Sequence, residues 1–266
     1  MIITYITWSV SPEILNIGPI SVRWYGLLFA LAFIAGYKIF EWFYQRENKP
    51  KADIEQLAIY MIFGTVIGAR LGHILFYNPE YYFSHPLEIL MVWKGGLASH
   101  GAAIGILIAL YLYVKKKKES FLWLMDRIVI VVALGGSFIR LGNLFNSEII
   151  GKPATVPWAF IFTRIDNVPR HPTQLYESLA YLIIFFILII IYKNKYKQLS
   201  NGFLFGLFLI LVFTFRFFVE FLKEVQEPFE LGMTLDMGQI LSIPFVLVGV
   251  YFIVRALKMK RINKKD

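Results

Sequence analysis

Apolar runs of about 20 residues recur along the whole chain, and this repeated length limits the folds open to it. Seven such segments lie at about 20–41, 54–76, 96–114, 121–140, 177–192, 202–222 and 237–256. In hydrocarbon a backbone must satisfy its own hydrogen bonds, so runs of this length cross a membrane as helices. Hydrophobic residues make up 58% of the chain. We therefore expect an all-α, polytopic integral membrane protein with about seven transmembrane helices, and a single transmembrane domain over residues 1–266.

The lysines and arginines predict the orientation of these helices. Eighteen of the 27 fall on one side, including Lys115–Lys118 and the C-terminal tail. The opposite connections hold five: Lys94, Lys152, Arg164, Arg170 and Lys223. Because basic loops stay in the cytoplasm, we expect the N-terminus outside and the C-terminus inside. The long connection at about 141–176 is then extracytoplasmic.

Several chemistries are excluded or disfavoured. The chain has no cysteine, which rules out disulfides, thiolate metal sites and a cysteine nucleophile on this chain. Its four histidines show no metal-ligand spacing, and no glycine-rich loop resembles a nucleotide site. We expect no metal and no cofactor. The basic tail is typical of a topology signal that contacts anionic lipids, and we expect no nucleic-acid partner.

Five ionisable residues inside the apolar runs are the strongest indication of a site: Arg23, Arg70, His100, Arg140 and Arg216. A charge in hydrocarbon costs roughly 2.5 kcal/mol or more, so such groups face a protein interior or a wet cavity. Counted along each span, all five fall in the outer half of the bilayer. This convergence predicts a cationic cavity below the outer headgroups. Guanidinium groups bind phosphate oxygens bidentately, so an anionic lipid headgroup is the expected occupant.

Each of these residues also has a purely structural interpretation. Arg23 lies near a span end and would then extend its charge to the membrane surface. Arg70 would be satisfied by helix carbonyls, and Arg216 would form a buried ion pair with Glu220 one turn later. His100 would be a packed core histidine.

Glycines four residues apart predict close helix packing, because small residues let helix backbones approach. They occur at Gly64-x-x-x-Gly68-x-x-x-Gly72, Gly101-x-x-x-Gly105 and Gly202-x-x-x-Gly206. The pattern of Gly95, Gly96 and Gly101 around His100 is interpreted differently, as a thinning of the helix entrance that lets a substrate approach the histidine.

The segment 140–151 holds the densest cluster of polar residues at a span end. On a continuing helix Arg140 and Asn143 share a face, so Asn143 is expected to donate to a phosphate or ester oxygen beside the arginine. Glu148 is expected to hold the arginine in position.

A second polar block covers residues 171–177 at the outer entry to the fifth span. Its simplest interpretation is a turn and a helix start. Thr173 would be the N-cap and Glu177 would lie in the first turn.

Five segments resemble the prolipoprotein diacylglyceryl transferase family along nearly the full length of the chain. They are Val22–Gly26, Gly95–Gly101, Arg140–Gly151, His171–Glu177 and Phe215–Phe221. Arg140–Gly151 is similar to the family signature and is highly specific. The resemblance implies a bacterial enzyme that moves the diacylglyceryl group of phosphatidylglycerol to the lipobox cysteine thiol of a prolipoprotein. This first step of lipoprotein maturation forms a thioether and releases glycerol phosphate.

The resemblance also implies partners and a location. The partners are phosphatidylglycerol, the signal peptide of a prolipoprotein with its lipobox cysteine, and membrane lipids. The protein would be multi-pass in the bacterial inner (cytoplasmic) membrane, with its active site toward the outer leaflet.

Site residues follow from the match and from the buried charges. The expected catalytic residues are His100, Tyr25, Arg140, Arg216 and Glu220. The expected phosphatidylglycerol-binding residues are Arg140, Asn143, Glu148, Gly151, Arg216 and Arg23. His100 is the candidate base for the thiol, and Glu220 is expected to orient Arg216. Ser99 and Val212 depart from the family pattern, and Val212 puts a tyrosine contact to the headgroup in doubt.

Two other classes of protein also place arginines in a membrane. A transporter or flippase for an anionic solute would need polar residues in both leaflet halves, whereas the inner halves of these spans are nearly all apolar. No internal repeat supports that class either. A non-catalytic receptor or assembly factor would have no need for His100 beside paired glycines.

Overall fold

The computed structural model describes residues 5–17, 20–92, 95–225 and 230–262. The chain forms two compact units, Met1–Gly36 with Met125–Asp266 and Tyr37–Leu124. Each unit is described by itself.

Within the described residues, six helices are long and apolar enough to cross a membrane. They are α1 (Trp24–Arg46), α2 (Ala52–Tyr77), α5 (Phe121–Asn146), α6 (Thr173–Lys195), α7 (Phe203–Glu220) and α8 (Met237–Ile262). The expected span 96–114 corresponds to α4 (Ser99–Lys117), which is not among the six. An all-α, multi-pass membrane protein is confirmed. The number seven and the orientation stay predictions.

The expected start of the first span at residue 20 is wrong. Residues Ile20–Arg23 form strand β3, which pairs antiparallel with β2 (Glu13–Ile17), and α1 begins only at Trp24. Valine and isoleucine in this stretch suit a pleated strand, and hydropathy alone does not distinguish such a strand from a helix start.

In the unit Tyr37–Leu124, glycines join α2 to α4. A Cβ added at Gly68 would lie 2.7 Å from the Cα of Gly105, and one at Gly101 would lie 2.7 Å from the Cα of Gly72. No side chain fits at such a distance, so the predicted packing role of these glycines is confirmed. The unit also holds α3 (Pro79–Ser84) and the 3-10 helix η1 (Pro86–Leu90).

In the other unit, α7 packs closely on α8. A Cβ at Gly206 would lie 2.8 Å from the carbonyl oxygen of Gly249 on α8. Gly202 has a different role from the one expected, because it caps α7 at φ +97°. Its N–H and that of Phe205 both donate to the buried carboxylate of Asp126, each at 2.8 Å.

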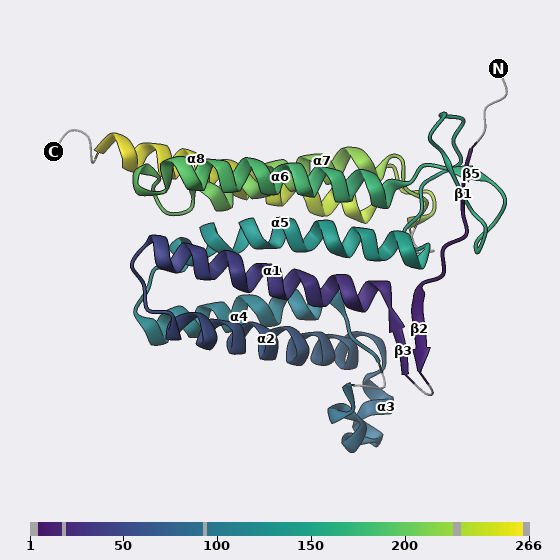
Figure 1. The fold of residues 1–266 in the computed structure, drawn as a ribbon, viewed down its shortest axis with the longest axis horizontal. Helices are drawn as coiled ribbons and strands as arrows, with labels where there is room; N and C mark the ends of the chain where they lie inside the picture. The colour runs from purple at the N-terminus through teal and green to yellow at the C-terminus, as the bar shows by residue number, and fades with distance from the viewer. Residues whose placement is uncertain (1–4, 18–19, 93–94, 226–229, 263–266) are drawn as a thin grey trace. The chain divides into compact units, whose positions relative to one another are not determined.

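The connection after α5 is partly a small sheet. Strand β1 (Ile6–Trp8) runs parallel to β4 (Phe160–Phe162), which is antiparallel to β5 (Pro169–Arg170). Figure 1 shows β1 and β5 beyond the ends of α6 and α7, away from the C-terminal end of α8. The Trp8 indole donates to the carbonyl of Leu144 at 3.1 Å, which fixes the sheet to the last turns of α5.

Candidate functional site

A chain of buried charges joins α5, α6 and the segment after α7. The Nε of Arg140 lies 3.1 Å from one carboxylate oxygen of Glu177. The other oxygen of Glu177 accepts from the Nζ of Lys223 at 3.1 Å. Lys223 also donates to Glu220 at 3.0 Å. The Glu177 side chain is completely buried and that of Lys223 is 4% exposed. Charges this deep persist only when paired.

Asn143 links Arg140 to Glu148. The Nη1 of Arg140 donates to Oδ1 of Asn143 at 3.2 Å, which confirms the predicted shared face. The Nδ2 of Asn143 donates to Glu148 at 3.1 Å. Glu148 therefore acts on the arginine through the asparagine, and the carboxylate that contacts the guanidinium directly is Glu177.

The backbone after α5 turns sharply at Glu148. Ser147 and Ile149 on either side of it both have φ +55°, a conformation that costs energy in a residue with a Cβ, most of all in a β-branched one. Two completely buried side chains hold this turn. Thr173 donates to the carbonyl of Ile149 at 2.9 Å, and Gln174 donates to that of Glu148 at 2.6 Å.

The expected capping role of Thr173 is therefore wrong. Pro172 stands at the N-cap of α6, and no side chain caps this helix end. Thr173 uses its hydroxyl for the turn after α5 instead.

Gly151 brings the segment after α7 next to this turn. It forms an antiparallel bridge with Lys223, and its N–H donates to the carbonyl of His171 at 3.0 Å. A Cβ at Gly151 would lie 2.6 Å from the His171 Cβ and 2.9 Å from the Leu222 carbonyl oxygen. Only glycine fits here, so its structural role is to position Lys223. Binding of phosphatidylglycerol by Gly151 stays a prediction.

Arg170 fastens the loops outside this cluster. Its guanidinium contacts Asp166 at 2.6 Å, Glu224 at 2.9 Å and the Gly151 carbonyl at 3.3 Å. Hydrogen bonds from the Arg170 guanidinium hold the pKa of the Asp166 carboxyl below its ordinary value. Burial lowers the pKa of neighbouring His171.

Arg216 on α7 is the one member of the cluster that lacks a protein partner within the described residues. Its Nε is buried, and no hydrogen bond or ion pair joins it to another described residue. Arg140 and Arg216 both lie close enough to Tyr181 to act electrostatically on its hydroxyl. The expected pairing of Glu220 with Arg216 is wrong, because Glu220 binds Lys223 instead.

Tyr25 and Arg23, which are two residues apart in the sequence, have different surroundings. Tyr25 packs on α5, where a Cβ at Gly142 would lie 2.7 Å from its ring, and Arg140 and Glu148 act on it electrostatically. The Arg23 side chain is 61% exposed and pairs with Glu13 at 3.5 Å across the hairpin. Arg23 as a lipid ligand stays a prediction.

Arg70 belongs to the unit Tyr37–Leu124. Backbone carbonyls satisfy its guanidinium, as the structural interpretation predicts. Its Nε donates to the Ile89 carbonyl at 2.9 Å, its Nη1 to the Gly95 carbonyl at 2.6 Å and its Nη2 to the Glu88 carbonyl. The guanidinium also stacks over Tyr82, 4.7 Å from the ring centre. With its donors used in this way, Arg70 serves to hold the segment after α3, and it is withdrawn as a phosphate ligand.

His100, in the same unit, lies in the first turn of α4 and is exposed. Its ring meets Phe76 edge-on at 5.1 Å and lies 5.9 Å from Tyr77, both on α2. An exposed imidazole fits a proton acceptor better than the packed core histidine of the alternative interpretation. Its catalytic role stays a prediction.

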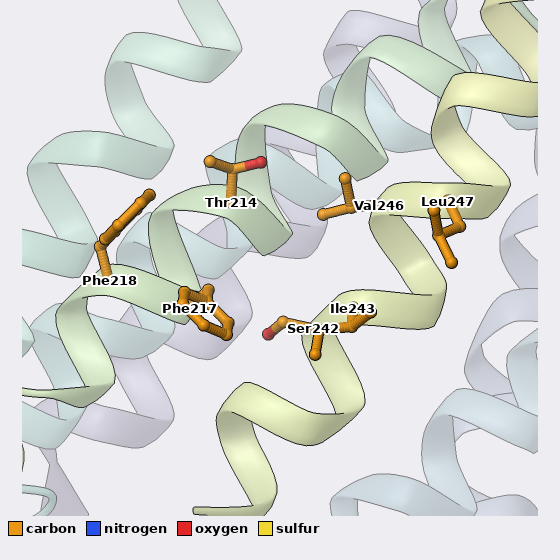
Figure 2. Close-up of a pocket in the computed structure, with 7 residues that line it drawn as sticks. All are labelled: Thr214, Phe217, Phe218, Ser242, Ile243, Val246 and Leu247. Carbon is orange, nitrogen blue, oxygen red and sulfur yellow. The ribbon is translucent and has the colours of Figure 1, made fainter. Parts of the chain in front are cut away.

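A hollow of about 200 Å³ lies between α7 and α8. Figure 2 shows its lining, with Thr214, Phe217 and Phe218 from α7 and Ser242, Ile243, Val246 and Leu247 from α8. The lining is almost wholly apolar, and its first aromatic residue directly follows Arg216 in sequence.

Glu177 and Lys223 were not predicted as site residues from the sequence, and neither were Thr173 and Gln174. The available signal was the row of polar residues at 173, 174 and 177, which opens an otherwise apolar helix. Lys223 resembled an ordinary loop lysine. Within the described ranges, no group of three or more histidines and carboxylates is arranged to hold a metal ion.

Comparison with known proteins shows the family of this chain. The family model described as prolipoprotein diacylglyceryl transferase matches residues 12–255. A phosphatidylglycerol–prolipoprotein diacylglyceryl transferase of Chloroherpeton thalassium is 49% identical, covering 98% of each chain. Proteins of the same name from Tolumonas auensis and Bacteroides fragilis are each 48% identical, covering 95% and 93% of this chain and 98% and 94% of their own. The chain belongs to the prolipoprotein diacylglyceryl transferase family.

Proposed function

We propose that this protein transfers the diacylglyceryl group of phosphatidylglycerol to the thiol of a cysteine in a prolipoprotein. The observation that carries the proposal is the guanidinium of Arg216, whose Nε is buried, which has no partner among the described residues and which lies with Arg140 beside Tyr181. A partly buried cation without a counter-ion has lost some of its hydration and favours an anionic partner. A lipid phosphate supplies the missing anion and forms two hydrogen bonds with a guanidinium fork.

The two arginines have different tasks in this proposal. Arg140 is held by Glu177 and Asn143, so its position is set before substrate binds. The C–O bond of the glycerol carbon breaks as the C–S bond forms, and negative charge grows on the departing glycerol phosphate. A fixed cation aimed at that charge stabilises the transition state without reorganisation. Arg216 anchors the phosphate, and Tyr25 supplies a further hydrogen bond.

The thiol must lose its proton before it attacks. Its unperturbed pKa is about 8.5, so at neutral pH a base is needed. His100 is the proposed base because it is exposed and a neutral imidazole nitrogen accepts a proton. His100 is proposed on the chemistry of its ring alone. If His100→Gln kept near-normal turnover, another group would have to take the proton.

The hollow between α7 and α8 is the proposed binding site for an acyl chain of the lipid. The lining of the hollow between α7 and α8 includes Phe217, the residue after Arg216, and is mostly aromatic and aliphatic. It suits an acyl chain and offers almost nothing to a polar headgroup. A lipid with its phosphate at Arg216 would keep its tails on the membrane side of α7.

The proposal also covers the accepting cysteine, the membrane and the orientation of the protein. The accepting cysteine is that of the lipobox in the precursor's signal peptide. The protein lies in the bacterial inner membrane as a single domain, with its N-terminus outside, its C-terminus inside and its site toward the outer leaflet. Membrane lipids surround it, and the distribution of lysine and arginine supports this orientation.

The direct test is transfer by the purified protein in detergent micelles. The substrates are phosphatidylglycerol that is labelled in its diacylglyceryl group and a peptide with a lipobox cysteine. The products should be a labelled thioether peptide and free glycerol phosphate. The same peptide with serine in place of cysteine should remain unlabelled. A transporter would move the lipid without labelling the peptide, and a receptor would bind it without product. Either result would refute the proposal.

A further inference from the structure

Three cations and two buried carboxylates lie on α5, α6, α7 and the segment that follows α7. The cations are Arg140, Arg216 and Lys223, and the carboxylates are Glu177 and Glu220. Among the described residues, this set leaves one positive charge without a counter-ion. Glu148 stands apart from it, because Glu148 is exposed and its carboxylate accepts from two asparagine amides.

The ion pairs of the two carboxylates identify the cation that has no counter-ion. Glu177 divides its two oxygens between Arg140 and Lys223, and Glu220 contacts Lys223. Arg216 is the cation left over.

Arg216 is left without a counter-ion because Glu220 pairs with Lys223 and not with Arg216. Glu220 follows Arg216 by four residues on the same helix, a spacing that brings two side chains within reach of each other. It instead contacts Lys223, three residues later, at 3.0 Å. Gly238 on α8 makes room for this arrangement, since a Cβ there would lie 2.5 Å from the Glu220 carboxyl carbon.

We propose that Lys223 is a positioning residue of the phosphate site: its ammonium engages Glu220 and one oxygen of Glu177, and so keeps Arg216 free for the lipid phosphate. Without the lysine charge, Glu220 turns to Arg216 and competes with the phosphate. This inference rests on the proposed function, because it deepens the account of the same site.

The experiment measures binding of dioleoyl phosphatidylglycerol to the full-length protein in detergent micelles. Dioleoylglycerol, which lacks the phosphate, is the matched lipid. Lys223→Met should bind phosphatidylglycerol about tenfold more weakly, equivalent to about 1.4 kcal/mol, and dioleoylglycerol as before. Lys223→Gln, which keeps a donor but no charge, guards against failure of the first variant to fold and should show the same loss.

Three further variants make the result specific. Lys223→Arg keeps the charge and should bind phosphatidylglycerol like the wild type. Lys223→Met/Glu220→Gln removes the competing carboxylate together with the lysine, restores one uncompensated cation and should recover binding. Lys152→Met removes an exposed lysine that donates to the Phe221 carbonyl, and its affinity should stay within a factor of about three.

Two results would overturn the inference. One is wild-type affinity for phosphatidylglycerol in both Lys223→Met and Lys223→Gln. The other is a double variant that binds as weakly as Lys223→Met. Transfer activity of the same wild-type preparation separates this inference from the proposed function. An inactive wild type with the expected binding pattern refutes the function alone, whereas an active one with unchanged Lys223 variants refutes the inference alone.

Discussion

Glu177→Gln is the substitution whose cost follows most directly from the structure. The carboxylate is completely buried and contacts two cations, Arg140 and Lys223, each at 3.1 Å. A glutamine keeps the shape but leaves both cations facing a neutral amide. Removing one partner of a buried ion pair costs about 3–5 kcal/mol, so we expect Glu177→Gln to lower the free energy of unfolding by about that amount. Transfer should fall as well, because Arg140 loses its support.

Glu224→Gln is the matched control. Glu224 pairs with Arg170 at 2.9 Å, nearly the same separation, but its side chain is 47% exposed. Exposed pairs contribute about 0–1 kcal/mol. Both variants can be unfolded by titration with denaturing detergent and followed by circular dichroism. Equal losses in the two variants would refute the reasoning, because burial would then make no difference to the value of the ion pair.

Two other perturbations test separate parts of the structure. Gly238→Ala should displace Glu220, whose carboxyl carbon would lie 2.5 Å from the new Cβ, and should reduce phosphatidylglycerol binding at least about tenfold. Gly135→Ala, with its nearest neighbour at 3.7 Å, is the control, and equal binding by both variants would contradict the packing argument. The pKa of Asp166 is lowered from 3.8 by Arg170, so the stability contributed by this pair is complete above that pH and is lost as the pH falls through the lower, folded-state value. The difference in thermal stability between wild type and Asp166→Asn should therefore vanish in strong acid, and a difference that persists there would count against an ionic origin.

Hydropathy predicts the membrane helices well because burial in lipid imposes one length and one composition on every span. The start of α1 was placed too early because β3 is as apolar as a helix end. The strands β1 and β4 were missed for a related reason. They are only three residues long and pair across about 150 positions of sequence, and no local pattern records that partnership.

In the candidate site, too, local contacts could be predicted from the sequence and long-range contacts could not. Contacts within one helix were predictable, as with Arg140 and Asn143. Contacts between segments far apart in the sequence were not, and Glu177 with Lys223 is the clearest case. The local pairing of Glu220 with Arg216 was chemically reasonable but wrong, because a closer competitor came from outside the helix.

The central claim is that the Arg216 guanidinium binds the phosphate of phosphatidylglycerol. Arg216→Lys keeps the charge and removes the planar fork, so it tests this claim most directly when transfer and folding are measured on the same preparation. We predict the loss of most transfer activity, with the unfolding transition and expression unchanged. Full transfer by the lysine variant would contradict a bidentate contact between Arg216 and the lipid phosphate.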